Sequence, residues 1–536
     1  MIVALEAFKL GLFTRKNFLK NAIGGVVVGV ISLPLSMAFA IASGVTPEIG
    51  IYTAIVAGLC VSIFGGSRYQ IAGPTGAFVP LLYSVVGEFG LDGLQLATIL
   101  AGIILIFMGI AKFGRLLKYI PTQVVVGFTS GIGTLLFMGQ LQNFLGSTDR
   151  VLIHGPTLAM GIGCLFLLIG MRFIPYMKHV PAPLCVLVVS AIVSASMSSH
   201  SIETVGSTFG GISNTLPMPA LPGGITAGRC LALLGPAFAI AILGAIESLL
   251  SAVVADGMTG TKHHSNQELI GQGIANILCP LFSGIAATGA IARTAANVRA
   301  GGTTPMSGIF ASISLLLILL LCAPLAKFIP LVALAAILFV ISYHMLGLSY
   351  FLHLLRHAPR TDVGILLTTY FLTIFCGLVI AVNVGIVLSS LFLMQRLASS
   401  IHIECNKPIE SSEDLELLSN IPNNVAVYSV SGPLFFAMAE KLELITAQVG
   451  SKVQIVILRL HGVPFIDTTA LTNLRQVIRK FQTSGRIFAF CEASEKVAHK
   501  LDRAELKDSL TIGNSKRTLL ETLYAVREYM QNQGKS

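Results

Sequence analysis

A stretch near the middle of the chain strongly limits what the protein can fold into. Leu231–Ala255 are 25 consecutive residues with one charged side chain, Glu247. About 20 predominantly apolar residues suffice to cross a bilayer as a helix, and similar runs recur, for example over Ile23–Ala42. Only 11% of the 536 residues are charged, whereas soluble domains contain about 25%. The sequence therefore predicts a polytopic α-helical protein embedded in the lipid bilayer.

The hydrophobic segments before residue 400 number about 14, and their spacing predicts the topology. Their centres lie near residues 32, 57, 81, 103, 130, 165, 190, 242, 276, 295, 314, 338, 370 and 390. If the N-terminus is cytoplasmic, 15 of the 19 Lys and Arg residues before residue 401 fall on the inner side. This asymmetry is the positive-inside pattern, so we expect both termini in the cytoplasm. Topology then explains the net charge of +10, and we expect no nucleic-acid partner.

The composition changes after Arg396. Residues 401–420 are polar and acidic and are expected to form a linker. Beyond them, β-branched runs alternate with amphipathic stretches, which is typical of a small α/β domain. Strands are predicted over Val425–Val430, Val453–Leu460 and Arg486–Phe490, and a helix over Thr469–Phe481. We therefore expect a transmembrane domain over residues 1–400 and a cytoplasmic domain over residues 421–536.

Two short segments contain residues that should break a membrane helix. Thr75–Ala77 follow a Gly73-Pro74 pair, and the same tripeptide recurs 213 residues later as Thr288–Ala290. Paired segments interrupted by Gly or Pro, one in each half of the chain, point to the central site of a transporter. The alternative is a pair of kinks that only help packing.

A helix that begins at membrane depth presents free N–H groups and the positive end of its dipole. Two such ends that face each other form an anion site without a buried lysine. We therefore predict a binding site for a small anion, lined also by the first span, although core packing is the alternative for the two residues of that span. The predicted residues are Pro74, Thr75, Gly76 and Ala77 of the first segment, Gly289, Ala290 and Ile291 of the second, and Pro34 and Phe39 of the first span.

Glu247 is expected to couple transport to its driving force. A charged side chain at the centre of a membrane span costs about 2.5–3.5 kcal/mol on insertion scales, so its presence indicates a function. Ser251 lies one turn further on the same helical face. Because burial disfavours the charged form of a carboxyl group, the hypothesis is that Glu247 carries a coupling proton, with Ser251 beside it. The alternative is a structural glutamate bonded to a neighbouring helix.

Two more charged residues lie near these segments in the sequence. Arg293 follows the second broken segment, where it either adds positive potential to the anion site or anchors the cytoplasmic rim, and both assignments stay open. Asp256, near the inner end of the span that contains Glu247, is expected to bond loop backbone.

Enzymes, primary pumps and metal proteins are disfavoured. The sequence has no G-x-x-x-x-G-K-[ST] loop to hold ATP phosphates. His263 and His264 are adjacent and point apart, while His353 and His357 lack the glutamate that a zinc metalloprotease needs at Leu354. Both pairs are expected to be solvated or interfacial. The nine cysteines form no C-x-x-C pair, so we expect packing cysteines, no metal and no cofactor.

Several long motifs resemble the SulP anion-permease family. They are GVISLPLSMAFAIASGV from Gly29, GGSRYQIAGPTGA from Gly65, GAIESLLSAVVADGMTGTKHH from Gly244, NQELIGQGIAN from Asn266 and AIARTAANVRAGGTTPMSG from Ala290. Within the family, the sequence looks most like the bacterial proton-coupled C4-dicarboxylate (succinate/fumarate) transporters. The resemblance covers nearly the whole chain.

This resemblance implies 14 spans in two inverted seven-helix repeats, with the third and tenth broken. It also implies a core domain that moves against a gate domain as an elevator, a homodimer, and a bacterial inner-membrane location. The C-terminal region resembles the STAS domain, for which a cytoplasmic binding protein is expected. Asp467, Thr468 and Thr469 replace the Asp-Ser-Ser run of anti-sigma antagonists, so Thr469 is a candidate phosphorylation site.

Proton coupling is favoured over sodium coupling by one departure from the family. Sodium-coupled bicarbonate members place Asp at Glu247 and Thr at both Ser251 and Ile291, so this chain has lost a side-chain oxygen at Ile291. Two further alternatives stay open. Sulfate, bicarbonate or chloride are the alternative substrates, and a signalling or scaffold protein that acts through its STAS domain is the alternative class.

Overall fold

The computed structural model describes residues 2–12, 14–115, 121–146, 153–173, 181–196, 202–405, 424–436, 453–506 and 518–533. The chain folds as two compact units, Met1–Ser389 and Ser390–Ser536. Residues 406–420, most of the predicted linker, lie outside the described residues.

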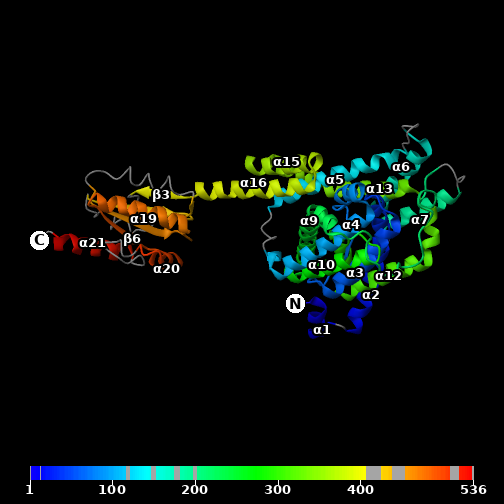
Figure 1. Cartoon of the computed structure of the whole chain (residues 1–536), viewed down its shortest axis with the longest axis horizontal. Helices are drawn as coiled ribbons and strands as arrows, with labels where there is room; N and C mark the ends of the chain where they lie inside the picture. The colour runs from blue at the N-terminus through cyan, green and yellow to red at the C-terminus, as the bar shows by residue number, and fades with distance from the viewer. Residues whose placement is uncertain are drawn as a thin grey trace. The chain divides into compact units, whose positions relative to one another are not determined.

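The first unit is built almost entirely from helices, the last of which continues past Ser389 into the second unit (Figure 1). They are α1 Val3–Lys9, α2 Arg15–Ala42, α3 Pro47–Phe64, α4 Val79–Ile110, α5 Thr122–Leu145, α6 Gly155–Gly170, α7 Ala182–Ser196, α8 Val205–Phe209, α9 Ala227–Thr259, α10 Ser265–Leu281, α11 Ile291–Arg299, α12 Met306–Cys322, α13 Leu331–Leu346, α14 Leu348–His357, α15 Arg360–Phe375 and α16 Leu378–Ser399. Short 3-10 turns cover Phe113–Arg115, Met171–Phe173 and Ala323–Phe328, and two two-residue strands, β1 Ala72–Gly73 and β2 Thr288–Gly289, interrupt the bundle.

The predicted segment positions agree with these helices. All 14 predicted centres lie inside helices, and the two centred near residues 81 and 103 share α4, which bends at Gly90 with φ 72° and ψ −177°. Glycine tolerates this backbone conformation. Within the described residues, eight helices are long and apolar enough to cross a membrane, while α6 and α7 are shorter apolar helices. The count of 14 crossings stays a prediction.

Small residues let the helices of this unit approach closely. A Cβ atom on Gly25 of α2 would lie 2.4 Å from Phe310 Cβ and 2.5 Å from Ser307 O of α12. On α4, a Cβ on Gly102 would lie 2.6 Å from the carbonyl oxygen of Gly273 in α10. Close backbone approach at small residues is the usual basis of helix packing in membranes, and it explains the glycine content of these spans.

We expect Gly25→Val to destabilise the first unit, because α12 leaves no room for a side chain at this position. Overpacking a close contact typically costs about 1–3 kcal/mol. Gly163→Val in α6 is the matched control, since nothing lies within 4 Å of a Cβ placed there. Thermal unfolding of the two variants in detergent should show a lower midpoint for Gly25→Val alone; equal midpoints would contradict the close α2–α12 contact.

The C-terminal unit is a three-layer α/β domain. Its strands are β3 His402–Cys405, β4 Val425–Ser431, β5 Ile455–Gly462 and β6 Ile487–Cys491, and its helices are α19 Thr468–Thr483, α20 Glu495–Arg503 and α21 Leu519–Gln533. The order is β3-β4-β5-β6, with β3 antiparallel to β4 and the other neighbours parallel. Alternate residues pack on opposite faces, as the period of a strand requires. One face contacts α19 and α20, and the other contacts α21.

The three predicted strands and the predicted helix of this unit are confirmed to within two residues at most ends. The prediction of a linker from residue 401 is wrong for its first residues. His402–Cys405 form β3, which pairs with Tyr428–Ser431. This strand escaped sequence analysis because polar His402 and Glu404 alternate with apolar Ile403, and an edge strand tolerates such exposed polar residues.

Candidate functional site

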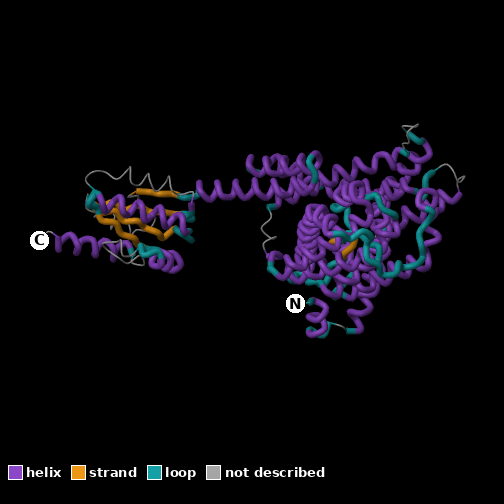
Figure 2. Tube along the Cα trace, viewed as in Figure 1, coloured by secondary structure: helices purple, strands orange, loops and turns teal. Residues whose placement is uncertain are grey.

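The two interrupted segments meet at the middle of the first unit, where Figure 2 shows their short strands among the helices. β1 pairs with β2 antiparallel, with Ala72 opposite Gly289 and Gly73 opposite Thr288. α4 begins at Val79 and α11 at Ile291, so each Thr-Gly-Ala sequence stands immediately before the start of a helix or one residue away. This pairing of β1 with β2, which we call the crossing, places the segments that lead into α4 and α11 side by side.

α11 satisfies the backbone of the first interrupted segment from one of its faces. Asn297 Nδ2 donates to the carbonyl oxygen of Tyr69 at 2.9 Å, and the Ile71 N–H donates to Thr294 Oγ1 at 3.1 Å. Arg293 Nη2 donates to the carbonyl oxygen of Pro74 at 3.1 Å. Residues 293, 294 and 297 share one helical face. Non-helical backbone at membrane depth must be satisfied within the protein, and these side chains do so.

The second interrupted segment is held by α10 and α3. Asn276 forms a reciprocal pair with Ala287: its Nδ2 donates to the carbonyl oxygen at 2.8 Å, and its Oδ1 accepts from the N–H at 2.9 Å. The Ile285 N–H donates to Thr53 Oγ1 at 2.9 Å. Thr288 Oγ1 donates to the carbonyl oxygen of Gly244 on α9 at 2.9 Å. Both segments are thus fixed by side chains from neighbouring helices.

Glu247 contacts the first interrupted segment directly. The Thr75 hydroxyl donates to Glu247 Oε2 at 2.8 Å. Glu247 is partly exposed on α9, whereas its neighbours Ser248 and Ile246 are buried. The carboxyl group therefore lies beside the interrupted segment that leads into α4, where a proton and an anion could both be bound.

Ser251 is not a partner of Glu247. Its hydroxyl is fully buried and donates to Thr294 Oγ1 at 3.1 Å, so it links α9 to α11. Ile291 begins α11 and is 40% exposed, while Gly289 and Ala290 are buried. The structure therefore exposes Ile291 and turns Ser251 into the packed interior.

Arg293 is buried behind the first interrupted segment rather than at a cytoplasmic rim. It is 1% exposed and its Nη2 also donates to Ser36 Oγ of α2 at 3.2 Å. Its Nη1 is buried without a hydrogen-bond partner among the described residues, and a Cβ on Gly73 would lie 2.2 Å from it. A buried guanidinium with a spare donor adds positive potential to the crossing, which favours the first of the two assignments from sequence.

Most of the residues expected to line the site are buried, and Phe39 lies close to the first interrupted segment. A Cβ on Gly76 would lie 3.0 Å from Met345 Sδ and 3.1 Å from Phe39 Cε1. Phe39 therefore reaches the first segment. Pro34, five residues before Phe39 in α2, is also buried. Pro74, Thr75 and Ala77 are buried as well.

Sequence analysis missed a second buried carboxylate, Glu268. It is 0% exposed in the first turn of α10. Gln272 and Asn276 follow it at intervals of four residues and are also buried. A polar stripe at i, i+4 and i+8 on an otherwise apolar helix was the available signal, because such residues share one face.

A polar cluster joins α1 to the loops beside the crossing. Glu6 accepts from Arg68 and lies 3.1 Å from His264 Nε2. Burial opposes the charged form of Glu6, but the bonds to Arg68 and His264 outweigh it and lower the pKa of this carboxyl. Of the two expectations for His263, solvated or interfacial, the first is wrong: its side chain is 3% exposed, with Nδ1 2.6 Å from Asp256 Oδ2. Asp256 also accepts from the His263 N–H at 3.0 Å, as predicted for loop backbone.

The other histidine pair lies on an exposed helix face. His353 and His357 stack on exposed positions of α14, with ring centroids 4.5 Å apart. In the described part of the chain, no group of three His, Cys, Asp or Glu residues could hold a metal ion. Cys491 is buried in β6, and burial raises the pKa of its thiol to about 12. This thiol stays protonated and packs as an apolar group.

Comparison with known proteins decides the family. Residues 18–369 match the model of the Sulfate permease family. The chain belongs to the sulfate permease family. Residues 417–519 match the STAS domain, so the C-terminal unit of this sulfate permease family member is a STAS domain.

Relatives of this family member match over most of their length. "Putative sulfate transporter YvdB" of Bacillus subtilis is 38% identical over 512 residues, which cover 91% of this chain and 94% of that protein. "Bicarbonate transporter BicA" of Picosynechococcus is 28% identical over 521 residues, covering 92% and 91%. The solved structure of the murine Solute Carrier 26 family member A9 anion transporter has a TM-score of 0.86 at 18% identity, covering 98% and 94%. The last likeness concerns the fold alone.

Within the STAS domain, the candidate phosphorylation site is accessible. Thr468 and Thr469 are exposed in the first turn of α19, and Asp467 Oδ1 caps this helix by accepting from the Ala470 N–H at 2.7 Å. A phosphate here would meet the positive end of the helix dipole. Phosphorylation of Thr469 stays a prediction.

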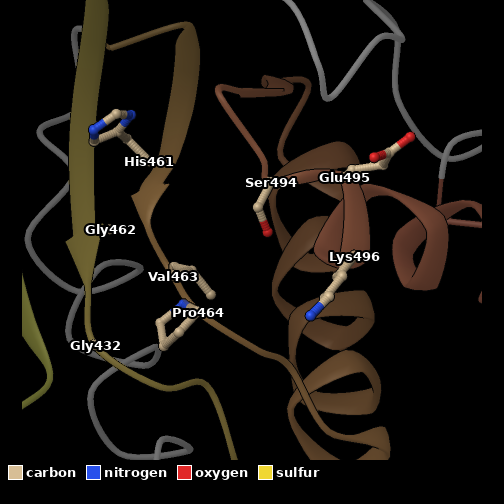
Figure 3. A pocket seen from close by; sticks show the side chains of 8 residues that line it. All are labelled: Gly432, His461, Gly462, Val463, Pro464, Ser494, Glu495 and Lys496. Carbon is tan, nitrogen blue, oxygen red and sulfur yellow. The ribbon is translucent and has the colours of Figure 1, made fainter.

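The STAS domain also has a hollow at the carboxyl ends of β4 and β5 (Figure 3). It is a shallow, open hollow with a volume of about 630 Å³. Ser494 and Lys496 at the start of α20 point towards the Val463–Pro464 side, and Glu495 points away. Its side chains near α20 are exposed. One helix N-terminus and exposed side chains do not define a ligand site.

Proposed function

We propose that the protein is a proton-coupled secondary transporter that takes up small anions by an elevator-type mechanism. The anion would bind between the N-termini of α4 and α11, near Thr75–Ala77 and Gly289–Ile291. Glu247 would take up the coupling proton. On the motif resemblance, the proposed substrates are C4-dicarboxylates such as succinate and fumarate.

The contact between Thr75 and Glu247 carries this proposal. It joins the acid to a residue of the first interrupted segment at 2.8 Å. An anion bound at the helix N-termini would lie next to this carboxyl group and would be repelled by its charged form. Binding of the anion and of the proton therefore favour each other, which is the thermodynamic basis of symport.

Proton coupling is supported over sodium coupling by the oxygen atoms around Glu247. The Thr75 hydroxyl is the side-chain oxygen bonded to Glu247 among the described residues, whereas the Ser251 hydroxyl is buried against Thr294 and Ile291 has no side-chain oxygen. Hard cations need several oxygen ligands, whereas a proton needs only the carboxyl group. Sodium coupling remains the alternative that the assay below separates.

The proposed topology places both termini in the cytoplasm of a bacterial cell and the chain in its inner membrane. Contacts between loops support it. Glu6, Arg68 and His264 meet, and all three are assigned to the inner side. Arg229 contacts the carbonyl oxygens of Phe89 and Gly223, which share the outer side. A homodimer and a cytoplasmic protein that binds the STAS domain complete the proposal.

Sulfate is the second candidate substrate. The observation that favours it is the name of the 38% identical Bacillus subtilis relative, and the name of BicA favours bicarbonate in the same way. Chloride remains a further alternative. Helix dipoles recognise negative charge in any of these ions.

Uptake into proteoliposomes tests substrate and coupling together. Labelled succinate, fumarate, sulfate and bicarbonate are offered under an imposed pH gradient and, separately, under a sodium gradient. We expect succinate uptake that accelerates when the outside is acidic and does not respond to sodium. Uptake of sulfate without uptake of succinate would show that sulfate, not a C4-dicarboxylate, is the substrate. Uptake that responds to the sodium gradient alone would contradict proton coupling.

A further inference from the structure

Glu268 is a buried carboxylate that the proposed mechanism does not use. It lies in the first turn of α10 and is 0% exposed. An isolated charge in such a position is costly, so its surroundings should explain why it is tolerated.

The carboxyl group of Glu268 is saturated with hydrogen-bond donors. Its Oε2 accepts from the N–H groups of Gly66 and Ser67 at 2.8 and 3.1 Å. Its Oε1 accepts from Ser248 Oγ at 3.1 Å and from Gln272 Nε2 at 3.0 Å. An ionised carboxylate accepts from all four donors, whereas a neutral carboxylic acid could keep its proton only on the side of the Ser248 hydroxyl, which would have to turn and accept instead of donate. The arrangement therefore favours the ionised form of Glu268.

These bonds connect Glu268 to the first interrupted segment. Gly66 and Ser67 lie in the loop that leads into this segment. Ser248 in turn accepts from Gln70 Nε2, at 3.1 Å on its carbonyl oxygen and 3.3 Å on its Oγ. Gln70 packs against the backbone of Gly289, because a Cβ there would lie 1.5 Å from Gln70 Nε2.

A second route connects Glu268 to the other interrupted segment. Gln272 donates to Glu268 and its carbonyl oxygen accepts from Asn276 Nδ2 at 2.8 Å. Asn276 holds both backbone groups of Ala287, directly before β2. One carboxylate thus lies at the junction of two hydrogen-bond chains, one to each half of the crossing.

We propose that Glu268 is a positioning residue for the transport site: an ionised hub that holds the two interrupted segments in register and does not carry the coupling proton. Glu247 differs from it in both respects. Glu247 is partly exposed and its hydrogen bond is to the Thr75 hydroxyl, so its charge can change without leaving four donors unpaired. That the site positioned by Glu268 transports anions with protons rests on the proposed function. The role of Glu268 in holding the two segments together does not.

The test compares full-length Glu268→Gln and Ser248→Ala with Asn21→Ala as a matched control. Glutamine would turn an amide N–H group towards existing donors, and Ser248→Ala removes one bond of the hub without removing charge. Asn21 Oδ1 also clamps two consecutive backbone N–H groups, those of Thr303 and Thr304, at 2.7 and 3.1 Å. This clamp joins α2 to the loop before α12.

The first measurement is amide hydrogen exchange, which requires no substrate. Glu268→Gln should speed exchange in both interrupted segments, residues 66–78 and 285–291. Asn21→Ala should leave both segments protected. Faster exchange confined to residues 66–67 would show that Glu268 stabilises only its own loop, and it would overturn the proposal. Should Glu268→Gln fail to fold, Ser248→Ala should still speed exchange around Gln70 and Gly289.

The second measurement is uptake of succinate and sulfate into proteoliposomes at several pH values. We expect Glu268→Gln to raise KM at least about tenfold, an effect of about 1.4 kcal/mol, and to keep its response to the pH gradient. Addition of Ser248→Ala should raise KM no further, since both variants break the same chain. A pH-independent Glu268→Gln beside a pH-dependent Glu247→Gln would assign the proton to Glu268. A pH-independent wild type would instead contradict the proposed function and leave the exchange result standing.

Discussion

Glu247→Gln is expected to abolish uptake driven by a pH gradient while leaving exchange of anion across the membrane intact. Glutamine has nearly the same shape as glutamic acid, and its Oε1 can accept the hydrogen bond from Thr75 that Glu247 accepts at 2.8 Å. It cannot bind or release a proton near neutral pH. The variant should therefore resemble the protonated protein, which binds anion but cannot complete a proton-driven cycle.

The measurement is accumulation of labelled anion in proteoliposomes under a gradient of one pH unit. One coupled proton can drive about tenfold accumulation at this gradient, because one pH unit corresponds to about 1.4 kcal/mol. Glu247→Gln should show a ratio near one and should still exchange internal for external anion. Glu48→Gln, an acid near the start of α3, controls for loss of a carboxylate. Undiminished accumulation by Glu247→Gln would falsify the role of this residue in proton coupling.

Gly289→Ala is expected to abolish transport while leaving membrane insertion intact. The added methyl group would lie 1.5 Å from Gln70 Nε2, far inside any contact distance. Gln70 is 3% exposed and is held by Ser248, so it has little room to move aside. β2 must then shift relative to β1, and a displacement of about 1 Å at a binding site can cost on the order of 100-fold in rate.

A second substitution identifies the cause of this loss. Gln70→Ala removes the side chain that clashes, so the double variant Gln70→Ala/Gly289→Ala should recover part of the uptake that Gly289→Ala loses. Gly257→Ala on α9 is the control, since nothing lies within 4 Å of a Cβ at that position. Equal loss in the single and double variants would show that the contact with Gln70 is not the reason glycine is needed.

The helical part of the fold could be predicted well because the bilayer imposes a simple rule. A membrane helix must be apolar over its length, so the 14 centres of hydrophobic sequence fall inside helices of the structure. The breaks were also visible, since Gly73, Pro74 and the repeated Thr-Gly-Ala mark places where a helix cannot continue. The β3 strand at His402–Cys405 carried no comparable signal, because its partner strand begins about 20 residues later.

The sequence predicted where the backbone of the candidate site breaks, but not which side chains form hydrogen bonds there. Thr75, Gly289 and Glu247 were found because each violates an expectation for a plain membrane helix. Ser251 was misassigned because helical spacing places it near Glu247 without showing that its hydroxyl turns to Thr294. Glu268 was missed because its partners, Gly66 and Ser67, lie 202 and 201 residues away. Such pairings depend on how α3, α9 and α10 pack.

The interlocked hydrogen bonds at the crossing also constrain how the protein is made. The N–H group of Ile71 donates to Thr294, which is synthesised 223 residues later in the chain. At about 5–20 residues per second, a ribosome needs roughly 10–45 s to synthesise that distance. During this interval the carbonyl and N–H groups around Ile71 lack their final partners, and lipid offers none. The newly made first half must therefore stay in a hydrated or protein-lined environment until α11 emerges, so completion of this crossing is a late event in biogenesis.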